Sequence, residues 1–284
     1  MDRFSRFNPK VTLLFFLFQI FITIVIFNPV VIAFSLAGAL AYKIKLKGRQ
    51  GISLIYKLVI PLVLVVALFN FIFSHRGATV LFTLFEMNYT LESLVYGICQ
   101  GGMLTAVTVW FSCFGDVLTA ERLLSVFGKF LPNTAMIFSM VLSFIPRLSR
   151  NAREISESRQ LVDEGESRLK KGINNLSALV TMTVEDSIVT ADSMKARGYG
   201  KGRTVYSKYK FSSSDFIILI ITLLLLAVLI FAKASGKFYF VYDPIIKTAP
   251  LSFWADMSVA LLSFLPVIID FEEDIRWYFL KRKI

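Results

Sequence analysis

The sequence predicts an all-α, polytopic integral membrane protein with about six transmembrane helices and a cytoplasmic module of long amphipathic helices. Of its 284 residues, 56% are apolar and only 18% are charged. A soluble domain is nearer 45–50% apolar and about 25% charged. The mean hydropathy is +0.66, and several uncharged stretches are long enough to cross the hydrocarbon core of a bilayer.

The first apolar stretch contains two helices. No charge occurs over the 32 residues between Lys10 and Lys43. As one helix this stretch would be about 48 Å long, which exceeds the hydrocarbon core of about 30 Å. Because proline has no amide to donate and obstructs the preceding turn, Asn28-Pro29 predicts a division into helices of about residues 11–27 and 30–43.

Four further apolar segments complete the predicted set of spans. They comprise residues 58–74, 93–115, 216–232 and 250–269. The last is interrupted only by Asp256, close enough to its start to lie at the membrane interface. Within the second, the polar and small residues Gln100, Gly101 and Gly102 are interpreted as allowing close helix packing.

The distribution of basic residues predicts a multi-pass protein of the cell membrane with both termini in the cytoplasm. With the N-terminus inside, the inner segments contain 27 of the 31 Lys and Arg residues, and the outer segments contain Arg76, Lys233, Lys237 and Lys247. An excess of Lys and Arg is typical of cytoplasmic loops. The net charge of +11 therefore reflects topology, and we expect no binding to nucleic acid.

The central segment differs from the rest of the chain. Residues 116–212 separate a four-helix region, 1–115, from a two-helix region, 213–284, and they carry 10 acidic and 15 basic residues. Apolar residues nevertheless recur at helical spacing. We expect a first helix at about 117–130, ended by Pro132-Asn133, with one face formed by Leu118, Leu123, Val126 and Phe130.

Two long amphipathic helices follow in this segment. The first, about 134–160, has an apolar stripe and a kink expected at Pro146; its stripe is Ile137, Val141, Phe144, Leu148, Ala152 and Ile155. The second, about 169–197, ends at Gly198, which suits a left-handed C-cap. Its stripe is Ile173, Leu176, Val180, Val184 and Ile188.

Each long helix carries an arginine near its C-terminal end, Arg159 and Arg197. On physical grounds alone, the favoured interpretation is that these cations lie beside anionic lipid headgroups. The alternative is that they dock another protein. The residues by themselves leave both open.

Several short motifs occur in a characteristic order: Asn8-Pro9, Leu13-Leu14, Asp116-Val117-Leu118, Phe130-Leu131-Pro132, Phe144-Ile145-Pro146 and Ser193-Met194-Lys195-Ala196-Arg197-Gly198-Tyr199. This series resembles the transmembrane (T) component of energy-coupling factor (ECF) transporters, the cobalt-transport permease-like family. The resemblance covers most of the chain.

The resemblance implies two coupling helices, each with a short arginine motif, usually Ala-Arg-Gly, that inserts into an ATPase subunit. Ala196-Arg197-Gly198 matches the second motif. Ser158-Arg159-Gln160 stands 38 residues earlier and is assigned as the first, although it lacks the glycine. Arg153 is the rival. Arg159 is preferred because it continues the apolar stripe and lies nearer the helix end.

The resemblance further implies a subunit of an ABC-type importer that binds no cofactor. Its partners would be two ABC ATPase subunits, a membrane-embedded substrate-binding (S) component and the lipid bilayer. The transported substrate would be a vitamin or a metal ion, recognised by the S component.

Two other classes of function remain as alternatives, a membrane-embedded enzyme and a permease that binds substrate itself. The chain has no G-x-x-x-x-G-K-[ST] motif, so we expect no ATP hydrolysis through a phosphate-binding P-loop. The best candidates for metal-binding carboxylates are Asp270, Glu272, Glu273 and Asp274, interpreted instead as charges where the last helix leaves the membrane. Cys99 and Cys113 belong to no Cys/His cluster, so neither a disulfide framework nor a zinc site is expected.

Overall fold

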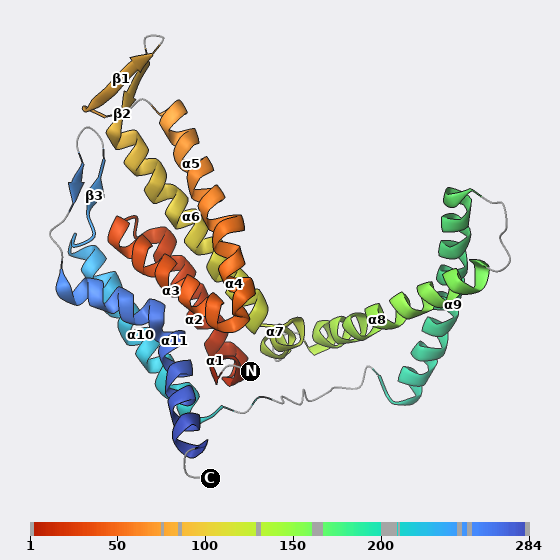
Figure 1. The fold of residues 1–284 in the computed structure, drawn as a ribbon. Coiled ribbons are helices and arrows are strands. Elements are labelled where there is room, and N and C mark those ends of the chain that lie inside the picture. Colours follow the sequence, from red (N-terminus) through yellow and green to blue (C-terminus); the bar gives the residue numbers. More distant parts are fainter. Residues whose placement is uncertain are drawn as a thin grey trace. The chain divides into compact units, whose positions relative to one another are not determined.

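The computed structural model describes residues 3–74, 77–84, 87–128, 132–160, 167–199, 209, 211–242, 246–248 and 252–281. These residues are almost entirely helical (Figure 1), which confirms the predicted all-α class. The chain divides into two compact units. The membrane unit comprises Met1–Thr119 and Tyr209–Ile284, and the polar-helix unit comprises Ala120–Lys208. The predicted regions 1–115, 116–212 and 213–284 concern membrane topology and stay a prediction.

Apolar helices form the membrane unit, one for each predicted span. They are α2 (Pro9–Val25), α3 (Pro29–Lys47), α5 (Ile60–Phe73), α6 (Leu91–Val117), α10 (Ser213–Ala234) and α11 (Phe253–Lys281). Five described segments are long and apolar enough to cross a membrane, and α2 is a shorter apolar helix of 17 residues. The prediction of a polytopic membrane protein is therefore confirmed.

Asn-Pro pairs begin the first two apolar helices. Asn28 caps α3 by accepting a hydrogen bond from the Val30 amide at 3.0 Å, and Pro29 is the first helical residue. Asn8 and Pro9 do the same for α2, with the Lys10 amide 3.2 Å from the Asn8 side chain. An N-cap side chain followed by proline is a favoured helix start, so the predicted division at Asn28-Pro29 is confirmed.

Glycines allow α6 to approach two neighbouring helices closely. A Cβ atom placed on Gly101 would lie 3.0 Å from the backbone oxygen of Val63 in α5, and one on Gly102 would lie 3.1 Å from the side chain of Ile32 in α3. Gln100 accepts a hydrogen bond from Asn70 of α5 at 3.0 Å. The interpretation of these residues as packing residues is confirmed.

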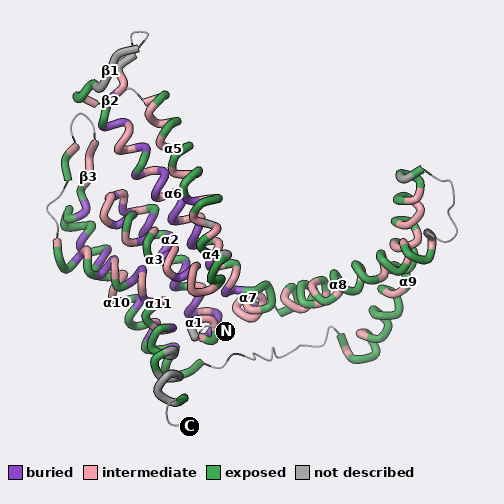
Figure 2. Tube along the Cα trace, in the orientation of Figure 1, coloured by how far each residue is buried: buried purple, intermediate pink, exposed green. Residues whose placement is uncertain are grey.

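A buried polar network joins four helices inside the membrane unit. Ser35 of α3 accepts hydrogen bonds from Trp110 of α6 at 3.0 Å and from Gln19 of α2 at 3.3 Å. Gln19 also donates to Ser263 of α11 at 3.0 Å, and Thr23 lies 2.7 Å from Ser35. Figure 2 shows that the buried residues concentrate in these helices. Polar contacts of this kind hold transmembrane helices together where no water is available.

Several elements of the membrane unit were not predicted. They are α1 (Arg3–Arg6), α4 (Arg49–Leu54), a π-helical turn (Ile55–Val59), and two antiparallel hairpins, β1 (Val80–Leu84) with β2 (Met87–Thr90) and β3 (Phe240–Val241) with β4 (Lys247–Thr248). The π turn ends at Val59, two residues before Pro61, which has no amide for a helical bond to the preceding turn. His75 and Arg76 lie outside the described residues.

The described residues of the polar-helix unit form three helices, α7 (Ala120–Phe127), α8 (Pro132–Gln160) and α9 (Arg168–Ala196). The helix predicted at about residues 117–130 corresponds to α7, but its predicted start was wrong. The Leu118 amide bonds to the Phe114 carbonyl at 2.8 Å, so Leu118 ends α6 and is buried in the membrane unit. Pro132 was expected to end this helix but instead begins α8. Phe130 lies outside the described residues.

Replacing Ser35 with Ala should destabilise the membrane unit, because the Trp110 and Gln19 donors would lose their shared acceptor. An unpaired buried donor costs about 1–3 kcal/mol. Thermal unfolding of the purified protein can be followed with a thiol-reactive dye, since Cys99 and Cys113 are free and buried. We expect a lower unfolding temperature for Ser35→Ala and no change for the exposed control Ser214→Ala. Equal temperatures would show that the network adds nothing to stability.

Candidate docking site on the long polar helices

Helices α8 and α9 pack against each other within the polar-helix unit. An ion pair between Arg147 of α8 and Asp186 of α9 joins them, with nitrogen and oxygen 2.9 Å apart. Asp186 shares one face of α9 with the half-buried residues Asn175, Leu179 and Thr183. This face is therefore the one that α9 turns toward α8.

The predicted apolar stripe of α9 lies on a neighbouring face and is exposed. Figure 2 shows that most of α9 is exposed. The five residues of the stripe have exposed fractions of 52–67%: Ile173, Leu176, Val180, Val184 and Ile188. From Ile173 to Ile188 the stripe extends about 22 Å along the helix. On α8, the second half of the predicted stripe, from Phe144 onward, is half-buried instead. A long exposed apolar stripe is typical of a surface that contacts another protein or a membrane.

The end of α8 contains the first predicted motif. The Ser158 hydroxyl donates to the Glu154 carbonyl at 2.8 Å, and Gln160 is the last residue of the helix. Arg159 is half-buried, and no carboxylate among the described residues pairs with its guanidinium. The rival Arg153 already has a partner, because its Nε lies 2.8 Å from Glu157 Oε1.

The end of α9 contains the second predicted motif. Ala196 is the last residue of α9, and Arg197 is exposed, again without an ion pair to any described residue. Gly198 has a φ of +80°, and the amides of Gly198 and Tyr199 bond to the carbonyls of Lys195 and Met194, both at 3.0 Å. This is a Schellman cap, and the predicted left-handed conformation of Gly198 is confirmed.

Of the carboxylates suggested as metal ligands, Asp270 has the best-defined surroundings in the structure. Asp270 is buried and accepts a hydrogen bond from the Phe4 amide at 3.0 Å. The contact with α1 thus buries Asp270 near the end of the last apolar span, and its interpretation as a charge where this helix leaves the membrane stays a prediction. Among the described residues, no group of three His, Cys, Asp or Glu side chains could hold a metal ion. The side chains of Glu273 and Asp274 lie outside the described part.

Sequence reasoning missed α1 as an anchor of the membrane unit. The Phe4 ring is buried among Phe15, Phe16 and Tyr42, with ring centroids 5.1, 6.1 and 5.9 Å away. The signal that could have indicated it was the apolar Phe4 between two arginines, Arg3 and Arg6.

Replacing Gly198 with Ala should weaken the last turn of α9, because a positive φ is costly for a residue with a Cβ atom. Gly172 provides a matched control, since it lies inside the same helix with nothing within 4 Å of an added Cβ. Alanine there should strengthen the helix by about 0.5–1 kcal/mol. Hydrogen exchange of the amides from 194 to 199 should accelerate only in Gly198→Ala. Equal exchange in both variants would contradict the role of this cap.

The comparisons with known proteins agree with the motifs. No family model matches the chain. The chain is 25% identical over 227 residues to the energy-coupling factor transporter transmembrane protein EcfT of Lactococcus lactis subsp. cremoris (strain MG1363). The aligned region covers 72% of this chain and 82% of that relative. Together with the apolar helices, this similarity confirms the resemblance: the chain is a multi-pass membrane protein that is similar to the transmembrane protein of an energy-coupling factor transporter.

Proposed function

We propose that this chain is the coupling subunit of an ECF-type importer. It would transmit the ATP-driven movement of two ABC ATPase subunits to a membrane-embedded S component, for uptake of a vitamin or a metal ion. The observation that carries the proposal is the pair of long helices, α8 and α9, each ending beside an arginine that has no charged partner among the described residues.

An arginine suits the role of an anchor in a partner's groove. Its planar guanidinium makes several directed hydrogen bonds to carboxylates and carbonyls. The neighbouring residues Ser158 and Ala196 are small, so a groove could close around each arginine. Two anchors on two helices would match two ATPase subunits.

The ion pair on α8 supports Arg159 as the first anchor. Arg153 is bonded to Glu157 one turn along its own helix, so docking would first have to break that exposed pair. Such a pair is worth only about 0.3–0.5 kcal/mol. The preference for Arg159 therefore rests also on its lack of a charged partner among the described residues and on its place nearer the helix end.

The exposed stripe of α9 supports a further contact, with the S component. Its aliphatic side chains would be unfavourable in water, and the first spans also present apolar surface to the bilayer. In the proposed orientation, both termini and the polar-helix unit lie in the cytoplasm, where ATPase subunits bind. The chain itself would not hydrolyse ATP.

Exchange of the two arginines for lysine tests docking against lipid contact. Lysine keeps the charge but loses the planar fork. We expect the amount of ATPase that co-purifies with the tagged chain to fall roughly tenfold or more in Arg159→Lys and in Arg197→Lys. This corresponds to a loss of binding free energy of about 1.4 kcal/mol or more per site. The measurement is ATPase co-purification at matched expression, with the co-purified proteins identified by mass spectrometry.

Arg153→Ala and Arg159→Ala are the internal controls for the motif assignment. Arg153→Ala should leave co-purification unchanged, and Arg159→Ala should reduce it as the lysine variant does. Wild-type retention by both lysine variants would overturn the docking proposal. A defect confined to Arg153→Ala would move the first motif to Arg153.

The proposed topology is tested with single cysteines at Ser158, Ser207 and Ser235 in a background without Cys99 and Cys113. A membrane-impermeant thiol reagent added to intact cells should label only the Ser235 position, because the other two would face the cytoplasm. All three should react after the cells are opened. Labelling of intact cells at Ser158 or Ser207 would reverse the orientation.

A further inference from the structure

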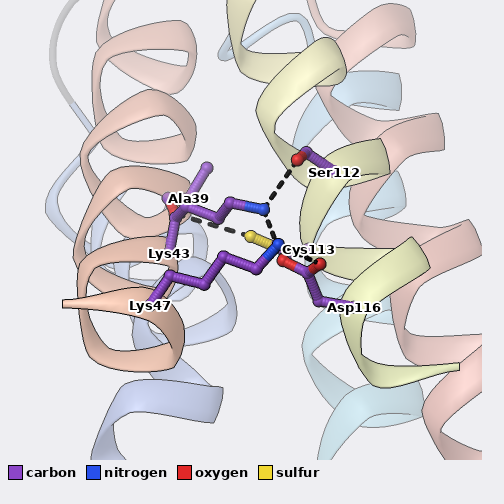
Figure 3. A network of polar contacts seen from close by, with 6 residues as sticks. All are labelled: Ala39, Lys43, Lys47, Ser112, Cys113 and Asp116. Atoms are coloured by element: carbon purple, nitrogen blue, oxygen red, sulfur yellow. Dashed lines mark hydrogen bonds and ion pairs between the residues drawn. The ribbon is translucent and has the colours of Figure 1, made fainter. Parts of the chain in front are cut away.

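A buried charge cluster connects the ends of α3 and α6 (Figure 3). Lys43 of α3 is 1% exposed, and its ammonium lies 2.7 Å from the Ser112 hydroxyl and 2.5 Å from Asp116 Oδ2, both on α6. Lys47, one turn further along α3, lies 2.7 Å from Asp116 Oδ1. Its side chain is 43% exposed, so Lys43 forms the inner and Lys47 the outer pair with one carboxylate.

The cluster lies where the chain leaves the membrane unit. Asp116 is the second-last residue of α6, the membrane unit ends at Thr119, and α7 begins at Ala120. The chain returns at Tyr209, and there the Asp215 carboxylate accepts from the Asn8 amide of the α2 cap at 2.9 Å. At both junctions, a carboxylate of the connecting helix is therefore bonded to one of the first two apolar helices.

The charges of the cluster depend on one another. A carboxylate in the last turn of a helix is repelled by the negative end of the helix dipole, and a buried ammonium in a membrane protein is costly unless it is paired. Removing one partner of such a pair leaves an uncompensated charge, whereas removing both can be nearly neutral. The pair therefore holds the end of α6 in one position against α3, because separating the two groups would leave each charge uncompensated.

Helix α3 is the element through which this connection reaches the rest of the membrane unit. It packs against α6 and α11, and its Ser35 holds the polar network that includes α2. A displacement at the end of α6 that is passed to α3 would thus act on several spans at once. A displacement confined to α6 would not.

We propose that Lys43, Ser112 and Asp116 form a rigid joint that transmits movement of the polar-helix unit into α3. These are positioning residues for coupling, and the inference rests on the proposed function of the chain. Lys47 shields the outer side of Asp116 and is not required for the joint. The expected signature is a nucleotide-dependent change in α3 that disappears when the joint is broken.

The test uses the tagged chain purified together with its ATPase subunits and reconstituted in lipid nanodiscs. Hydrogen–deuterium exchange is measured with and without a non-hydrolysable ATP analogue. In the wild type, exchange should change in α8 and α9 and in the last two turns of α3. In Asp116→Asn, the change in α8 and α9 should stay within twofold, and the change in α3 should fall at least threefold. The matched control Lys47→Met should resemble the wild type.

The outcomes separate the joint from the proposed function. An unchanged α3 response in Asp116→Asn would overturn the joint, as would a wild type that responds in α8 and α9 but not in α3. A wild type without any response in α8 and α9 would contradict the proposed function, and the joint with it. A role in folding alone would alter exchange of α3 equally with and without nucleotide.

If Asp116→Asn does not accumulate, the double variant Lys43→Met/Asp116→Asn replaces it, because it leaves no buried lysine without a counter-charge. It should accumulate and lose the α3 response. A wild-type response in the double variant, or its failure to accumulate, would assign the cluster to folding alone and overturn the joint.

Discussion

The hydrocarbon core of the bilayer contains no water, so each polar group within it needs a partner in the protein. This constraint accounts for the main features of the membrane unit. The Ser35 network pairs the polar side chains of α2, α3, α6 and α11 with one another. The Lys43–Asp116 pair does the same for two charges near the ends of α3 and α6. Asn8 and Asn28 satisfy backbone amides where apolar helices begin.

The polar-helix unit shows the reverse arrangement, with apolar groups left in contact with solvent. Helix α9 turns a partly polar face toward α8, including the Asp186 carboxylate that pairs with Arg147, while its aliphatic stripe is exposed. If α9 buried this stripe within its own unit, the helix would present no apolar surface to a partner. The proposed coupling function rests on this exposed stripe and on the two arginines at the helix ends, which have no charged partner in the described part of the chain.

The parts of the fold that depend on local chemistry could be predicted from the sequence. The division at Asn28-Pro29, the cap at Gly198 and the long helices α8 and α9 follow from residues close together in the chain. The boundary between α6 and α7 was wrong by a few residues, because Leu118 fits the stripe of the following helix as well as the end of α6. The burial of Phe4 and Asp270 was missed because they are 266 residues apart in the chain and meet only through tertiary packing.

The sequence by itself determined that this protein spans a membrane, which side its basic residues favour, and which two arginines stand at the ends of amphipathic helices. Hydrophobicity, charge and helical periodicity are local properties, so they can be read along the chain. Only the tertiary structure decided which charges on different helices are paired. Lys43 and Asp116 are 73 positions apart, and Arg153 and Arg159 look alike in the sequence. The Lys43–Asp116 pair arises only when α3 packs against α6, whereas Arg153 pairs with Glu157 within one helix and Arg159 has no charged partner among the described residues.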